Sequence, residues 1–191
     1  MFEGLQKHSQ SLYLIILVAS VATIFGLNWG PGARGCSEGH ITITYAARVY
    51  GYISEHDLGD RVRLLGWQNQ ERCRREMQDA DIFLAPSVVD ADGRGEGGAP
   101  TTILEAQAMG MPVVSTRHCD IPYVTRPGES ALLVGERDDE ALAEALVELL
   151  EQPERWSQMG RAGRDHVERH HDVTVEAARL EEIYAGLGAT A

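Results

Sequence analysis

The sequence predicts an α/β fold: a Rossmann-like, mostly parallel sheet with helices on both faces and a helical C-terminus. From Leu58 onward, short apolar runs alternate with segments of helical periodicity, which is typical of βα units. The run RVRLL ends at Gly66 and the run DIFLA at Pro86, and 20 glycines allow tight turns between strands and helices. The 191 residues suffice for one ordinary domain with a full hydrophobic core.

Four short runs are predicted as strands: Arg61–Leu65, Asp81–Ala85, Pro112–Ser115 and Ala131–Val134. The second run, DIFLA, shows no alternation of polar and apolar residues, so we expect it to be buried on both faces of the sheet. The segment Ile41–Glu55 is a strand or a helix, and its pattern does not decide between them.

Helices are predicted between and after these strands. They cover Asn69–Asp79, Pro100–Met109, a short turn at Ile121–Val124, a segment opening at Asp138–Glu140, another opening at Pro153, and Asp172–Leu187. Apolar residues recur at helical spacing in the last three. They are Leu142, Ala145, Leu146, Leu149 and Leu150; then Trp156, Met159, Gly163 and Val167; then Val173, Ala177, Leu180, Tyr184 and Leu187.

The first 34 residues form a separate hydrophobic segment, and residues 35–191 form the predicted α/β domain. Leu12–Leu27 is almost wholly apolar, but a membrane-spanning helix needs roughly 20 apolar residues. Only Lys7 supplies a fixed positive charge ahead of it, and no A-x-A cleavage pattern follows. A membrane anchor, an uncleaved targeting segment and buried core all stay open.

Charge and cysteine content narrow the function classes. The net charge of -12 repels phosphate backbones, which argues against nucleic-acid binding. Much of the acid lies in Glu136–Glu151 and Glu176–Glu182, which we interpret as solvated helix faces. The sequence contains no CxxC pair, so we expect Cys36, Cys73 and Cys119 to be free thiols in a reducing cytoplasm. Association of this cytoplasmic protein with a membrane through Leu12–Leu27 stays open.

The stretch from Glu96 to Ala106 contains the residues that predict a ligand-binding site. Its glycines let backbone N–H groups approach a ligand, and the following helix directs its N-terminal N–H donors to the same place. The loop Ser87–Ala99 that precedes this helix leaves the carboxyl end of a buried strand, where α/β sheets bind ligands. These features predict a diphosphate site, flanked by the carboxylates of Glu96 and Glu105.

This stretch resembles the donor-binding motif of retaining GT-B glycosyltransferases of the group 1 (family 4) type, which includes colanic-acid and lipopolysaccharide transferases. The likeness extends over "RVRLLGW", "ADIFLAPS", "EGGAPTTILEAQAMGMPVVST" and "LEEIY", from Leu58 to Leu187. It implies one GT-B half that binds a nucleoside-diphosphate sugar, for hexosyl transfer with retention and without metal or cofactor. It assigns Glu96 as the catalytic contact to the sugar and Glu105 as the ribose ligand. The remaining donor-binding residues are Gly97, Gly98, Ala99, Pro100, Thr101 and Thr102.

The sequence departs from the family pattern in three ways. Eight residues separate Glu96 from Glu105, one more than is usual in the family. No R-x5-KG segment precedes Leu58, and we expect these residues to lack the N-terminal domain that binds the glycan or lipid-linked acceptor in the family. We therefore expect a donor-binding half with low or absent turnover alone. A non-catalytic nucleotide-sugar-binding or partner-binding module, and an epimerase of related fold, are the alternatives.

Several other polar or aromatic residues allow both a functional and a purely structural interpretation. Asp90-Ala91-Asp92 resembles a DxD metal motif, but we favour a solvated loop because the glycine-helix motif downstream already provides a phosphate site. His166 and His170 have the spacing of a metal-binding pair on a helix, against which we set solvated histidines. The segment His118–Asp120 and the side chain of Trp67 either border the donor or serve as loop and core.

Overall fold

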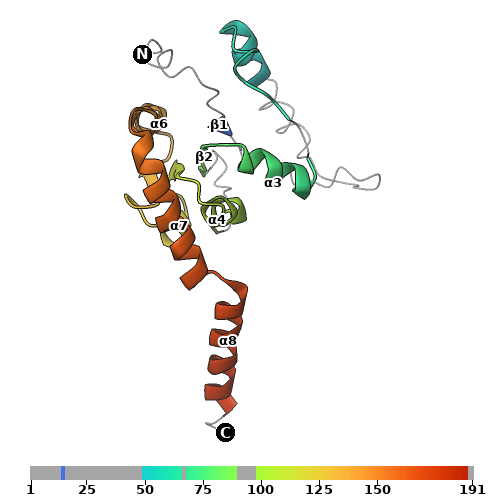
Figure 1. Ribbon diagram of the computed structural model, residues 1–191, viewed down its shortest axis with the longest axis vertical. Helices are drawn as coiled ribbons and strands as arrows, with labels where there is room; N and C mark the ends of the chain where they lie inside the picture. The colour runs from blue at the N-terminus through green and yellow to red at the C-terminus, as the bar shows by residue number, and fades with distance from the viewer. Residues whose placement is uncertain (1–13, 16–48, 66–67, 90–97, 189–191) are drawn as a thin grey trace.

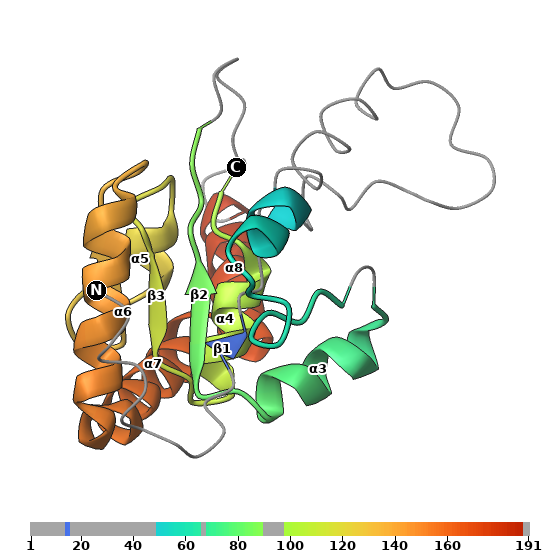
Figure 2. The same ribbon diagram turned by 90° about the horizontal axis from the view of Figure 1, so that it is seen from above.

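The computed structural model describes residues 14–15, 49–65, 68–89 and 98–188. Within these ranges the chain forms a four-stranded sheet in the order β1-β2-β3-β4, and every pairing is parallel. The strands are β1 (Leu14–Ile15), β2 (Ile82–Ala85), β3 (Val113–Thr116) and β4 (Ala131–Val134). Helices lie on both sides of the sheet, so the predicted parallel α/β architecture is confirmed (Figure 2).

Strands β2 and β3 are buried on both faces, and successive side chains along each strand point into opposite layers. Phe83 is paired with Val113, and Val113 with Ala131; all three belong to one hydrophobic cluster. The next residues along each strand belong to a second cluster on the opposite face. β2 and β3 are buried at every position, as the unbroken apolar run at Asp81–Ala85 predicts.

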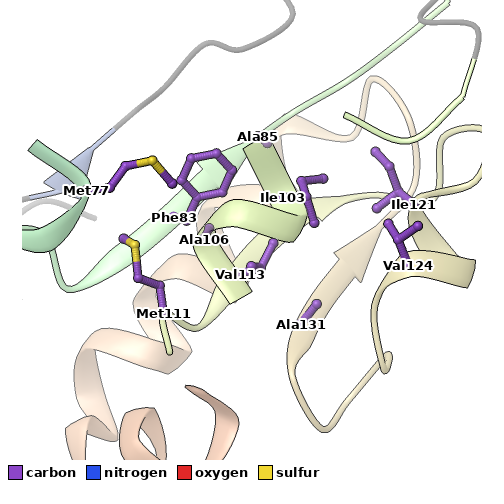
Figure 3. Packing of buried hydrophobic residues seen from close by; sticks show 10 residues of the cluster. All are labelled: Met77, Phe83, Ala85, Ile103, Ala106, Met111, Val113, Ile121, Val124 and Ala131. Carbon is purple, nitrogen blue, oxygen red and sulfur yellow. The ribbon is translucent and has the colours of Figure 1, made fainter. Parts of the chain in front are cut away.

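One face of the sheet is covered by α3 (Gln70–Gln78), α4 (Thr101–Ala108) and α5 (Ile121–Val124). In Figure 3 the side chains of Met77 and Met111 gather around Phe83 at one end of this cluster. Ile103 lies toward the other end, with residues of α5. Asn69 caps α3 by accepting the Arg72 N–H at 2.9 Å, so this helix begins where the sequence predicts.

The other face is covered by α6 (Asp139–Glu151), the short 3-10 turn η2 (Pro153–Arg155) and the start of α7 (Trp156–His170). Asp138 caps α6 by accepting the Ala141 N–H at 3.0 Å. The apolar residues predicted at helical spacing in α6 pack against this second cluster. Trp156 joins them, and its indole N–H donates to the Leu149 carbonyl at 2.7 Å.

Helices α4 and α7 approach each other at backbone distance. Gly110 ends α4 with φ +78, and the N–H groups of Gly110 and Met111 donate back to Gln107 and Ala106. Gly160 of α7 lies so close that a Cβ placed on it would be 1.9 Å from the Gly110 carbonyl oxygen. Contact at this distance requires glycine at position 160.

Helix α8 (Val173–Gly188) extends away from the sheet and from the other helices (Figure 1). Its apolar residues are exposed, among them Val173, Leu180, Ile183 and Tyr184. The helix is predicted correctly by periodicity, but within the described chain its apolar stripe contributes nothing to the core.

The predicted strand at Arg61–Leu65 is wrong. Arg61 lies in a turn and residues 62–65 have no regular structure. Both edges of β2 are already paired, one with β1 and the other with β3, so no place beside β2 remains for this run. Arg63 instead pairs with the buried carboxylate of Glu76 on α3.

Several expectations fall partly or wholly outside the described residues. In Ile41–Glu55, residues 49–55 are helical, and the earlier ones are not described. In Leu12–Leu27 only β1 is described, where it lies beside β2 in the sheet. No helix within the described ranges has both the length and the apolar character needed to cross a membrane. Trp67 lies outside them.

Candidate functional site

The carboxyl ends of β2, β3 and β4 meet at one edge of the sheet, together with the N-terminus of α4. The chain leaves β2 through Pro86–Val89 and returns to the described part at Gly98, just before α4. Two hydroxyl groups tie β3 to the exit of β2. Ser115 Oγ donates to the Ala85 carbonyl at 2.6 Å, and Thr116 Oγ1 donates to the Ser87 carbonyl.

The N-terminus of α4 lacks both common forms of stabilisation. Pro100 occupies the N-cap position without a side-chain hydrogen bond, and the first turn holds no acidic residue. An α-helix does not use its own first N–H groups, and within the described part of the chain no hydrogen bond is found for those of Thr101 and Thr102. The Thr102 hydroxyl is buried and finds no hydrogen-bond partner in the described structure.

Glu105 lies one turn further along α4 and is exposed to solvent. The structure therefore brings together Gly98, Ala99, Pro100, Thr101, Thr102 and Glu105 of the predicted donor site. Glu96 and Gly97 lie outside the described residues, as do Asp90 and Asp92 of the alternative metal motif.

The loop after β3 forms the opposite border of this site. A Cβ placed on Gly98 would be 3.7 Å from Asp120 Oδ2, which is ordinary van der Waals contact. Cys119, the preceding residue, is exposed and has φ +42, a left-handed conformation uncommon outside glycine. The segment His118–Asp120 thus lies beside Gly98, and its contact with a donor stays a prediction.

His118 and Glu136 connect the loops that follow β3 and β4. His118 is fully buried, and its Nδ1 lies 2.8 Å from Glu136 Oε1. The other carboxylate oxygen accepts the Val89 N–H at 2.9 Å, while the Arg137 guanidinium donates to the Val89 carbonyl. The Val89 N–H and, second, His118 hold the pKa of Glu136 below its ordinary value of 4.5. This carboxylate thus fixes the backbone of Val89 beyond the carboxyl end of β2.

The interpretation of Glu136 as part of a solvated helix face is wrong. Helix α6 begins only at Asp139, so Glu136 belongs to the loop at the carboxyl end of β4. Its position directly after the run ALLVG was the available signal, because side chains at this edge face the loops of neighbouring strands.

The histidines at the end of α7 form a ring cluster in which His170 is exposed, as a solvated histidine would be, whereas His166 and His171 are not fully solvated. The ring centroid of His166 is 5.0 Å from that of His170 and 5.1 Å from that of His171, and Tyr123 meets His171 edge-on at 5.7 Å. His166 and His171 are half-buried, and burial is the main cause that lowers the pKa of each. No group of metal-ligating side chains is found in the described ranges, which gives the metal alternative no support.

A groove of about 520 Å³ lies at the opposite, amino edge of the sheet. It is lined by residues that precede β2 and β3 and by the start of α7, including Asp81, Gly110, Pro112 and Trp156. Because ligands of parallel sheets bind at the carboxyl edge, this groove is not the predicted donor site.

The family model described as "Glycosyl transferases group 1" matches residues 44–152, more than half of the chain. The chain belongs to the group 1 glycosyltransferases. Among curated relatives it is 37% identical over 152 residues to the amylovoran biosynthesis glycosyltransferase AmsK of Erwinia amylovora, covering 78% of this chain and 37% of the relative. It is 41% identical over 99 residues to the putative colanic acid biosynthesis glycosyltransferase WcaL of Escherichia coli, covering 52% of this chain and 24% of the relative.

Solved structures place this group 1 glycosyltransferase chain in the GT-B fold. Sucrose-phosphate synthase from Thermosynechococcus elongatus superposes with a TM-score of 0.67 at 24% identity, over 91% of this chain and 42% of the other. HepE of Anabaena, solved in complex with UDP-glucose, superposes with a TM-score of 0.61 at 17% identity, over 74% of this chain and 37% of the other. The matched part of this chain thus spans well under half the length of these relatives.

Proposed function

We propose that this group 1 glycosyltransferase chain binds a nucleoside-diphosphate sugar at the carboxyl edge of its sheet and serves as the donor half in glycosyl transfer. The observation that carries the proposal is the N-terminus of α4. It is uncapped, follows a glycine loop, lies opposite Asp120 and is followed by the exposed Glu105.

The chemistry of transfer matches these groups. The bond between the anomeric carbon and the diphosphate oxygen breaks, and the leaving diphosphate gains negative charge. Backbone N–H groups between Gly98 and Thr102, together with the partial positive charge of the α4 N-terminus, stabilise that charge. Glu105 accepts hydrogen bonds from the ribose hydroxyls, and Glu96, outside the described residues, contacts the donor sugar. The scheme assigns no role to a metal or cofactor.

The named relatives support transfer over binding without catalysis, and over epimerisation. AmsK and WcaL are named as glycosyltransferases of amylovoran and colanic acid biosynthesis, and HepE was solved with UDP-glucose. The acceptor in this proposal is a glycan or lipid-linked glycan, held by the part of the relatives that lies beyond the matched region.

Calorimetric titration of the full chain with UDP, GDP, UDP-glucose and GDP-mannose tests donor binding. We expect saturable binding of one base series, which also identifies the base. The absence of binding in both series would contradict the proposal.

Turnover is the second test, because it separates a donor half from a complete enzyme. The chain lacks an R-x5-KG segment before Leu58, so positive charge that would neutralise the leaving diphosphate is missing. We expect no release of nucleoside diphosphate from the bound sugar nucleotide when the chain is assayed alone. Steady turnover by the purified chain would contradict the assignment as a donor half.

A further inference from the structure

Three side chains at the carboxyl edge form a continuous chain of contacts: Cys119, His118 and Glu136. Cys119 Sγ lies 3.2 Å from His118 Nε2, and His118 Nδ1 lies 2.8 Å from Glu136 Oε1. A nucleophile in contact with a base that a third group orients is the arrangement by which proteins activate thiols and hydroxyls.

The carboxylate determines which nitrogen of the imidazole can accept a proton. Glu136 is ionised near neutral pH, because the Val89 N–H and His118 hold its pKa below the ordinary value. An ionised carboxylate only accepts hydrogen bonds, so the Nδ1 of neutral His118 carries the proton. Nε2 then presents its lone pair to Cys119 Sγ, as a general base requires.

The side chains of His118 and Cys119 differ in how far they are buried. His118 is fully buried, which shields the base from water, whereas Cys119 is exposed to solvent. Cys119 also has the left-handed backbone conformation described above, which is rare for a residue with a side chain. Cys73 offers an internal contrast, since it is half-buried and its thiol faces the Gln68 carbonyl at 4.0 Å rather than an imidazole.

We propose that Cys119 is a base-activated thiol and a site of covalent modification by low-molecular-weight disulfides. The Sγ proton passes to His118 Nε2 while Sγ attacks one sulfur of the disulfide. A new S–S bond joins Cys119 to that half, and the old S–S bond breaks. The departing thiolate takes the proton from His118 and leaves as a thiol, so the exchange needs no further oxidant.

The inference does not depend on the proposed donor site, although the two are neighbours. Asp120, the next residue, lies against Gly98, so an adduct on Cys119 stands at the border of the glycine loop. The reactivity is a property of the three side chains and can be measured without any nucleotide sugar.

The test follows the modification of each cysteine in the full chain by 2-hydroxyethyl disulfide, with peptide mass spectrometry after quenching. This reagent is uncharged, so the net charge of -12 does not bias its approach. The same reaction in 8 M urea gives the rate for a fully accessible thiol without the folded arrangement. We expect Cys119 to react at least about tenfold faster in the folded chain than in urea, because general-base assistance adds to accessibility. An equal or slower rate in the folded chain would overturn the proposal, since exposure alone cannot exceed full exposure.

A variant separates orientation of the base from exposure of the thiol. Glu136→Gln removes the negative charge behind His118, and we expect the folded-state rate at Cys119 to drop about tenfold or more while the rate at Cys73 stays unchanged. Circular dichroism verifies the fold of this variant, and Cys119→Ser identifies the labelled peptide. A well-folded Glu136→Gln chain that reacts as fast as wild type would overturn the proposal. If this variant does not fold, the proposal is tested by the rates at Cys119 in the folded and the urea-treated wild-type chain alone.

Discussion

In the proposed site, Glu105 recognises the nucleoside half of the donor. Its side chain is exposed although α4 is otherwise packed against the sheet through Ile103, Ala106 and Gln107. It lies one turn beyond the uncapped N-terminus, so a ligand with its diphosphate at Thr101 would present its ribose toward this carboxylate.

Replacing Glu105 by Gln is expected to weaken UDP-sugar or GDP-sugar binding by about tenfold to a hundredfold, the loss of one or two charge-assisted hydrogen bonds. The free energy of unfolding should change little, because the side chain is exposed. Titration calorimetry measures the affinity. Glu151→Gln is the matched control, since Glu151 is an exposed glutamate at the far end of α6. Equal affinity in wild type and Glu105→Gln would contradict the assigned role.

The residues of this site differ in how far the sequence predicts them. Gly98 to Glu105 are contiguous, and a local motif that opens a helix indicates its own structure. His118 and Glu136 are 18 residues apart and meet only because β3 and β4 are neighbours in the sheet. Their pairing depends on strand order, which no local pattern contains, so the local pattern alone indicates a helix face for Glu136.

At the scale of secondary structure elements, the contact between α4 and α7 holds the donor helix in place. Gly160 and Gly163 of α7 pack against Gly110 and the buried side chain of Gln107. Gln107 Nε2 donates to the Val124 carbonyl at 2.7 Å, and its Oε1 accepts from Ser130 Oγ at 2.8 Å. Helix α4 is thereby joined to α5 and to the start of β4 through one buried amide.

A glycine exchange tests this contact. Gly160→Ala is expected to lower the free energy of unfolding by about 1–3 kcal/mol or more, because the new methyl group would meet the Gly110 carbonyl oxygen. Gly186→Ala in α8 is the matched control: nothing lies within 4 Å of its new Cβ, so we expect a gain of up to about 1 kcal/mol from helix propensity. Urea unfolding measures both changes. Equal effects of the two exchanges would show that the close approach of α4 and α7 is incorrect.

The histidine cluster at the junction of α7 and α8 predicts a loss of stability in mild acid. Burial lowers the pKa of His166 and of His171 below the ordinary value of 6.5, so the unfolded chain binds these protons first as the pH falls. Their stabilising effect is complete above the unfolded pKa and is lost as the pH falls through 6.5 toward the folded values. The groups that face them are Tyr123 and Arg126 beside α7, Asp165, Arg169 and His170 on α7, and Glu176 and Arg179 on α8.

His166→Gln removes one of these protonation sites and keeps a donor for the Tyr123 carbonyl. We expect the drop in Tm between about pH 7.5 and pH 5.5 to be smaller in this variant than in wild type. His56→Gln is the control, because His56 is exposed and lies outside the cluster. An unchanged pH dependence in His166→Gln would contradict the role of the cluster.

Among the elements, the buried strands and amphipathic helices were predictable because their periodicity reflects burial directly. The run Arg61–Leu65 has the composition of a strand but does not form one. Segments far apart in the sequence can pair with the same edge of a sheet. Here β1, and not Arg61–Leu65, pairs with that edge of β2. Strand propensity carries no information about that competition.

At the scale of the whole molecule, two regions of the described structure are candidates for the ligand-binding site. The amino edge has the groove of about 520 Å³, and the carboxyl edge has the uncapped helix, Glu105 and the loops held by Glu136. We assign the nucleotide to the carboxyl edge because that edge combines N–H donors with carboxylates for hydroxyl groups. The groove at the amino edge receives no role in transfer.

The most direct test of this assignment is a ¹H–¹⁵N correlation experiment on the full chain during titration with the nucleoside diphosphate that calorimetry selects. We expect the amide resonances of Gly98, Thr101 and Thr102 to shift in a saturable way, together with that of the neighbouring Asp120. Shifts concentrated instead on Gly110, Met111 and Trp156 would place the nucleotide at the amino edge and contradict the account.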